Sequence, residues 1–353
     1  MKEEKPMTTT QPQVPVLLLI DVEPDGFFID RNKKAPWTGF ERALEIIADL
    51  RPRLAQKTGR NAHFTWLVRA DPQVAETYHS SAWAFEYYRQ ALEELLAAQD
   101  EVGLHVHAYR WHAEGNCCIE DYGNQEWINH CIHLGVSAFE KFFQRKPPSF
   151  SMGMDWTNQA TIQLVTELQI RYEFSAILGK EVQPFPTLGT YTGVAPDCSR
   201  IPQRPYRPSQ TDFLSPVTHQ EDGIWIFPQS SRVARIERSW KRRLFDLVRL
   251  QPTPPPCTRK FFLQDDPAAL RVSIDDMLGH LGRPYLTFAV RTHEFTRPER
   301  IATIRRNLDS ALEHPAAERF VFTTPAKALR ILGYRDEGQR GEVGRPLRDN
   351  KEP

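Results

Sequence analysis

The chain has 353 residues, in which 45 Lys and Arg balance 45 Asp and Glu, and 40% of the residues are hydrophobic. This composition supplies a sizeable core and excludes a disordered or fibrous protein. The net charge is zero, whereas nucleic-acid binders usually carry a strongly basic surface. We therefore expect a neutral polar substrate and no nucleic acid. The five Cys show no CxxC spacing, which argues against a disulfide framework and a thiolate zinc site.

The N-terminal part of the sequence gives no sign of a membrane segment. Its longest apolar run, 14–20, contains Pro15 and ends at Asp21, well short of the roughly 20 residues that span a bilayer. The residues before this run mix acids with bases and contain no small-residue cleavage site. We therefore expect a cytoplasmic protein without a membrane span.

Short β-branched or Leu-rich runs alternate along the chain with amphipathic patterns, which is typical of βα units around a parallel sheet. The expected strands are 14–21, 63–68, 101–107, 149–152, 170–177, 223–227, 285–291 and 320–323. The expected helices begin at a capping box, Thr38 to Glu41, and continue with 83–98, 125–143, 158–168, 298–312 and a last helix opened by Pro325. The helix that starts at Thr38 contains Pro52, where we expect a kink.

Two Pro-rich stretches interrupt this alternation, at 178–222 and 228–260, and we interpret them as insertions. The second holds an expected basic helix, 239–250, followed by a polyproline spacer, 251–256. We expect a flexible N-terminus at 1–13, one domain at 14–334, and a disordered tail at 335–353. The sequence thus predicts an α/β fold, a closed or partly open barrel of seven or eight parallel strands whose site lies at the carboxyl ends of the strands.

Two acids mark the end of the first expected strand. Asp21 directly follows a buried-looking Leu-rich run, and Glu23 lies two residues further. Residues i and i+2 of an extended chain share a face, so both carboxylates can point into the barrel mouth. One could act as a general base and the other as a metal ligand. The alternative interpretation is an acid-rich turn that continues through Asp25.

Two histidines occupy the end of the third expected strand. His105 and His107 share a face by the same alternation, and two neutral imidazoles on a rigid strand are half of a transition-metal site. With one acid from the first strand they would leave a coordination position open to water, as in catalytic zinc sites. Structural histidines satisfied by the backbone are the alternative. His293 follows a late strand and is a candidate proton donor.

Other polar residues fall on the same expected rim. Arg69 and Asp71 follow the second strand, Asp155 and Trp156 follow the fourth, and we list all four as candidate substrate-binding residues. The Pro-rich loop 206–209 is a further candidate for positioning a sugar. Each of these residues could equally be structural.

Taken in order, these motifs resemble the NodB-like polysaccharide deacetylases, carbohydrate esterase family four. The resemblance rests on Asp-Val-Glu at 21–23, His-x-His-x-Tyr-Arg-Trp at 105–111, the segment 149–156 and the late His293, and it covers residues 14–332. Within this family, the sequence resembles in particular a divergent branch. The resemblance implies a distorted (β/α) barrel of about seven parallel strands, a divalent metal, zinc above all, and removal of N-acetyl groups from amino sugars of a poly- or oligosaccharide.

The resemblance also implies roles for individual residues. Asp21 would be the general base and His293 the general acid, while Glu23, His105 and His107 would bind the metal, with Asp25 in reserve.

The sequence departs from the family pattern at three places. Tyr109 stands where the second histidine is common, Ser151 stands where an Arg orients the base, and the second acid is Glu23 rather than the neighbour of Asp21. We therefore predict that Arg69 supplies a cation to Asp21 or Asp155. The departures keep open a catalytically impaired carbohydrate-binding protein on the same fold. An amidohydrolase is a third hypothesis. We rank it last, because the HxH motif of amidohydrolases lies at the end of the first barrel strand, and here it follows the third.

Overall fold

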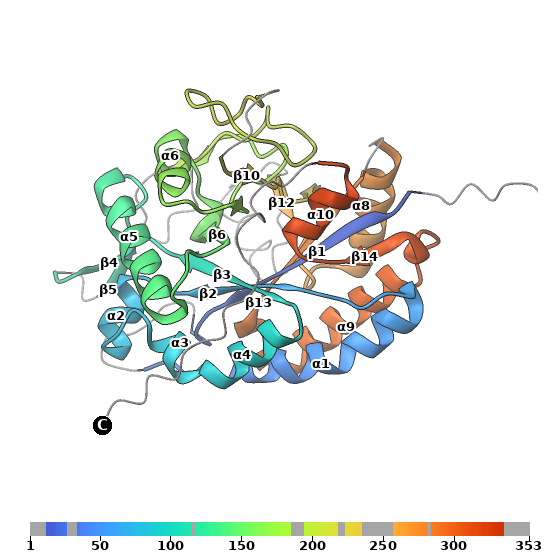
Figure 1. Ribbon diagram of the computed structural model, residues 1–353, viewed down its shortest axis with the longest axis horizontal. Helices are drawn as coiled ribbons and strands as arrows, with labels where there is room; N and C mark the ends of the chain where they lie inside the picture. Colours follow the sequence, from blue (N-terminus) through green and yellow to red (C-terminus); the bar gives the residue numbers. More distant parts are fainter. Residues whose placement is uncertain are drawn as a thin grey trace, which may run out of the picture.

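A curled parallel sheet forms the centre of the molecule (Figure 1). The computed structural model describes residues 12–26, 34–114, 117–184, 194–217, 223–234, 257–280 and 284–334. The sheet runs in the order β10–β7–β6–β3–β2–β1–β13, with all pairs parallel, and β14 pairs with the first residues of β1. Its strands are β1 (Val14–Val22), β2 (Thr65–Arg69), β3 (Glu101–Val106), β6 (Ser149–Met152), β7 (Tyr172–Glu173), β10 (Trp225–Ile226), β13 (Leu286–Arg291) and β14 (Phe320–Phe322).

The two edges of the sheet approach one another. Beyond β10, Ser230 donates its backbone N–H to the hydroxyl of Thr287 on β13 at 2.6 Å, and the Thr287 N–H donates to the Ser230 hydroxyl at 2.9 Å. Phe262 forms a parallel bridge with Ala289 on the same strand. These contacts link the edges, and the expected α/β architecture, a distorted barrel of parallel strands, is confirmed.

Helices cover the outer face of the sheet, and a second apolar cluster fills its inside. The helices are α1 (Thr38–Thr58), α2 (Pro72–Tyr78), α3 (Trp83–Tyr87), α4 (Arg89–Ala97), α5 (Gln125–Phe143), α6 (Gln159–Glu167), α8 (Pro267–His280), α9 (Pro298–Leu312) and α10 (Pro325–Ile331), with 3-10 turns η1 (Gly153–Asp155), η2 (Thr292–Thr296) and η3 (Ala317–Arg319). Leu18 and Ile20 face the helices, whereas Leu17, Leu19 and Leu67 face inward. Alternation along β1 therefore predicts that Asp21 and Glu23 also face inward.

Helix α10 contributes Ala328 and Leu329 to the inner apolar cluster. It follows β14, which pairs with the first residues of β1, so it fills the barrel at the amino ends of the strands. The carboxyl ends of the strands are left for polar side chains.

The helix and strand predictions differ in how well they match. Helix 125–143 and strand 149–152 have the expected bounds, while the expected helix 83–98 is two helices with Tyr88 between them. Helix α2 was not expected, because seven residues are too few to show a helical period. Three two-stranded sheets were also missed: β4 (Tyr109–His112) with β5 (Cys117–Glu120), β8 (Gln183–Pro184) with β9 (Val194–Ala195), and β11 (Ser231–Ala234) with β12 (Cys257–Lys260).

The expected capping box of α1 is wrong. Thr38 is already helical, and the N-cap residue Trp37 makes no side-chain cap. Instead, the Asp25 carboxylate accepts the backbone N–H groups of Thr38 at 3.0 Å and Gly39 at 2.8 Å. The helix then continues past Pro52 to Thr58. Because both Asp25 oxygens cap this helix, the prediction that Asp25 is a reserve metal ligand is corrected: Asp25 is a helix-capping residue.

The expected basic helix 239–250, the polyproline spacer 251–256 and the tail 335–353 lie outside the described residues. Within the described ranges, none of the helices is both long and apolar enough to cross a membrane.

Candidate metal and acid–base site

Strand register brings the candidate residues to one height of the barrel. Arg69 on β2 pairs with His105 on β3, and His105 pairs with Ser151 on β6. On the other side, Asp21 on β1 pairs with Arg291, the last residue of β13. Neighbours in a parallel register point the same way, so one polar layer forms at the carboxyl ends of these strands.

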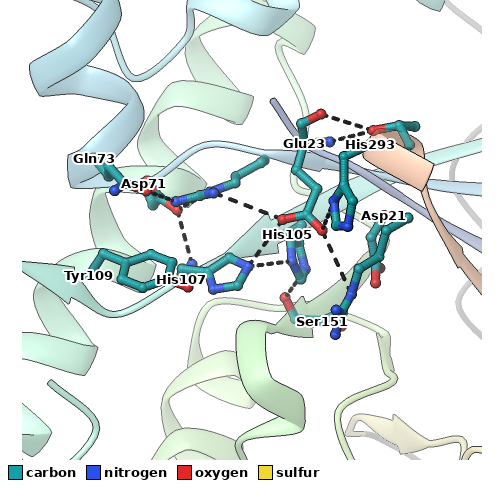
Figure 2. Close-up of polar contacts among 12 residues, drawn as sticks. Asp21, Glu23, Asp71, Gln73, His105, His107, Tyr109, Ser151 and His293 are labelled. Atoms are coloured by element: carbon teal, nitrogen blue, oxygen red, sulfur yellow. Dashed lines mark hydrogen bonds and ion pairs between the residues drawn. The ribbon is translucent and has the colours of Figure 1, made fainter. Parts of the chain in front are cut away.

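Glu23, His105 and His107 form the centre of this layer (Figure 2). One ligand atom from each lies within 4.8 Å of the others, and all three residues are buried. The two Nε2 atoms of the histidines are 3.0 Å apart, and His107 Nε2 is 3.6 Å from a Glu23 carboxylate oxygen. Within the described residues this is the group that could hold a metal ion.

The surroundings of the two imidazoles suit metal binding. His105 Nδ1 lies 3.0 Å from the backbone carbonyl of Ser151, which can only accept, so Nδ1 donates to it and Nε2 is the ring nitrogen that faces His107. Burial, aided by the nearby Arg69 guanidinium, lowers the pKa of His107 to about 3, so its ring is neutral. The donor set of one carboxylate and two imidazoles is one that zinc accepts.

Neighbouring residues hold His107 in place. The Asp71 carboxylate accepts the His107 backbone N–H at 3.1 Å and the Arg69 Nε–H at 2.6 Å. The Tyr109 ring stacks on the His107 ring with centroids 4.9 Å apart. A Cβ at Gly153 would come within 2.2 Å of the His107 ring, so only glycine fits there. Nδ1 of His107 is buried and has no hydrogen-bond partner among the described residues.

The cation beside Asp21 is Lys260, not Arg69. Lys260 Nζ is 2.6 Å from Asp155 Oδ1 and 3.9 Å from Asp21 Oδ2, and its side chain is 4% exposed. Arg69 instead pairs with Asp71, and its Nη1 lies 3.9 Å from Glu23. The prediction for Arg69 is therefore corrected, because Asp71, two residues away on the same chain, captures its guanidinium.

His293 lies on the opposite side of Glu23 from His107 (Figure 2). Its Nδ1 is 3.6 Å from a Glu23 oxygen, and its Nε2 is 3.5 Å from Glu294. Burial opposes its charge, but these two carboxylates outweigh burial and raise the pKa of His293 to about 9. The His293 ring is thus protonated near neutral pH. Conversely, the pKa of Glu23 lies well below its usual range, because His107 and His293 outweigh burial.

The rim residues named from the sequence are placed as follows. Arg69 and Asp71 are 1% and 0% exposed and contact each other, and Trp156 packs on Tyr122 with ring centroids 5.3 Å apart. Asp155 keeps 14% of its side chain exposed and holds Lys260.

Sequence reasoning missed Lys260, Arg291 and Thr292. Thr292 ties the site together, because its hydroxyl accepts the Glu23 N–H and donates to the Glu23 carbonyl, both at 2.9 Å. Arg291 could have been found as the last residue of a predicted strand. Lys260 had no such signal, because it lies at the end of a Pro-rich insertion.

Comparison with solved structures identifies this architecture. No protein-family model matches the chain, and no curated protein matches it by sequence. The structure resembles PuuE allantoinase, with 13% identity, a TM-score of 0.51 and coverage of 91% of this chain and 90% of the other. It also resembles a probable polysaccharide deacetylase from Pseudomonas aeruginosa PAO1, with 12% identity, a TM-score of 0.50 and 91% of each chain covered. The chain has the NodB-like deacetylase fold.

A third likeness is consistent with this NodB-like barrel. A protein from Parabacteroides distasonis, described as a glycoside hydrolase or deacetylase, has 13% identity and a TM-score of 0.51, with 93% of this chain and 72% of that one covered. At such identities the comparisons establish the NodB-like fold, and function has to be argued from the site.

Proposed function

We propose that this protein is a metal-dependent hydrolase that removes N-acetyl groups from amino sugars of a poly- or oligosaccharide. The observation that carries the proposal is the convergence of Glu23, His105 and His107 beside Asp21, at the carboxyl ends of the strands of a NodB-like barrel. The proposal is supported by the names of structural neighbours that include polysaccharide deacetylases.

The residues that would hold the metal are Glu23, His105 and His107. The two Nε2 atoms, 3.0 Å apart and with a Glu23 oxygen 3.6 Å from His107 Nε2, fit a cation between them better than they fit each other. Zinc is our choice, because imidazole nitrogens dominate the donor set. A divalent cation there would supply Lewis acidity, which polarises an acyl carbonyl and acidifies a water molecule.

The chain's own residues account for the proton transfers. Asp21 would accept the proton of the attacking water, and Lys260 and Asp155 would hold the Asp21 carboxylate in place. His293, protonated near neutral pH and 3.6 Å from Glu23, would donate a proton to the departing amine. A base and an acid beside one polar centre suit hydrolysis of an amide.

A catalytically impaired sugar-binding protein is the second candidate, motivated by Tyr109 and Ser151. Two observations favour the enzyme. His107 lies beside the Nε2 of His105, so the cluster has its second imidazole without a histidine at position 109. Lys260 brings a cation to Asp21 although Ser151 carries none.

The proposal is tested by elemental analysis of protein purified without a His-tag, with and without a chelator. We expect one divalent metal per chain, and loss of affinity in His105→Ala, measured by competition with a fluorescent chelator. A panel of acetylated amino sugars then tests turnover, and Asp21→Asn should keep metal and fold but lose deacetylation. Stoichiometric metal without turnover on any substrate would favour the sugar-binding protein, and unchanged metal affinity in His105→Ala would refute the site.

A further inference from the structure

Arg291 is the most exposed of the charged side chains that contact Glu23 or Asp21. Its side chain is 24% exposed, compared with 13% for His293, 4% for Lys260 and 1% for Arg69. It ends β13 in register with Asp21, two residues before His293. Arg291 is thus the charged side chain of this group that is most accessible to a substrate.

The two arginines near Glu23 differ in how their donors are used. Arg69 donates to Asp71 and to Gln73, and it is closed off from solvent. Arg291 makes no hydrogen bond within the described ranges, and its nearest carboxylate contact is 3.8 Å from Nε to Glu23. The Phe262 ring lies 5.0 Å from the centre of its guanidinium and covers one of its faces. A guanidinium has five N–H donors, so Arg291 offers an unused set at the mouth of the site.

We propose that Arg291 is a substrate-binding residue that recognises a carboxylate, so that the preferred substrate is an acidic glycan, with a uronic acid or a lactyl-ether sugar at or beside the acetylated unit. This inference rests on the proposed function. Carboxylate is the natural partner because the planar guanidinium fork matches its two oxygens. The inference also revises the neutral substrate expected from the net charge of the whole chain, since a local site need not share that balance.

The test compares ligand pairs that differ by one carboxylate: methyl glucuronide with methyl glucoside, and N-acetylmuramic acid with N-acetylglucosamine. Binding to the purified protein, whose metal content is determined separately, is measured by calorimetry or ligand-observed NMR. We expect the wild type to bind the acidic member of at least one pair more tightly. Arg291→Gln should remove that preference, with a loss of about 10-fold or more for the acid, the usual effect of a lost charged hydrogen bond. Binding of the neutral sugar should change little.

Control variants separate recognition from structure. Arg232→Gln removes an arginine of similar exposure, 22%, which pairs with Asp265 at 3.2 Å, and it should leave both affinities unchanged. Arg291→Lys keeps the charge without the fork and should bind the acid with intermediate affinity, so it serves if Arg291→Gln loses metal or fold.

Three results would overturn the inference: equal wild-type affinity within both pairs, equal losses for acid and neutral sugar in Arg291→Gln, or tighter binding of glucose 1-phosphate than of either acid. Metal content is read separately, so a protein without metal refutes the proposed function while the preference for acids is still measured.

Discussion

Replacing Lys260 by Met should damage both the stability of the fold and the placement of Asp21. The Lys260 side chain is 4% exposed, and its ammonium group lies 2.6 Å from Asp155 and 3.9 Å from Asp21. Met has a similar length and no charge, so the variant leaves the buried Asp21 and the partly buried Asp155 without this partner. Arg291 is near enough to both acids to offset part of the loss.

The size of the effect follows from the burial of the pair. Breaking a buried ion pair by removing one partner costs about 3–5 kcal/mol. Because Arg291 compensates in part, we expect Lys260→Met to lower the free energy of unfolding by about 3 kcal/mol. Displacing a general base lowers the rate about 10²-fold, which is a smaller loss than removing the base altogether. We therefore expect kcat of Lys260→Met to fall about 100-fold, with a smaller change in KM.

Chemical denaturation and steady-state kinetics on a turned-over amino sugar measure these two effects. Lys146→Met is the matched control, because Lys146 pairs with Glu140 at the surface with 38% of its side chain exposed, where such pairs contribute about 0–1 kcal/mol. Lys260→Arg should recover part of kcat, because the charge is restored. A Lys260→Met enzyme with wild-type kcat would refute the argument that this lysine positions Asp21.

Two further predictions concern the surroundings of the site. Gly153→Ala puts a Cβ within 2.2 Å of the His107 ring, so metal affinity measured by chelator competition should fall at least about 10-fold. The control Gly279→Ala has open space around the added Cβ and should leave metal affinity unchanged. Burial raises the pKa of Glu173 from 4.5 to about 7, so the folded state retains a proton that the unfolded chain releases between these values. The free energy of unfolding should then decrease by about 3 kcal/mol as pH rises from 4.5 to 7. In urea titrations, Glu173→Gln should lack this part of the pH dependence. If the free energy of unfolding of Glu173→Gln depended on pH as steeply as that of the wild type, the burial argument would be contradicted.

Hydrophobic periodicity was sufficient to predict the central sheet. The strand 14–21 was found because it is a continuous apolar run, buried on both faces, and the helices 125–143 and 298–312 were found because each buries one apolar face. The short helix α2 and the three two-stranded sheets were missed, because two to seven residues carry no measurable period. The start of α1 was misread, because its cap comes from Asp25, beyond the local sequence window.

The candidate site was predictable where ligands sit at fixed offsets on a strand. Alternation predicts that Asp21 shares a face with Glu23 and His105 with His107, and the structure brings Glu23, His105 and His107 together. Their roles stay proposals. Lys260 could not be found in this way, because it enters from a hairpin outside the sheet, and its position depends on tertiary contacts with Asp155.

The contacts of His107 explain how an HxH pair can take the place of a more widely spaced pair. Strand β3 ends at Val106, so strand geometry alone does not fix His107. The Asp71 carboxylate holds its backbone N–H, and the Tyr109 ring stacks on its imidazole. Tyr109 in turn donates its hydroxyl to Glu120 at 2.7 Å, which anchors the ring from the β4–β5 hairpin. Tyr109 thus supports the imidazole that we propose as the second histidine ligand.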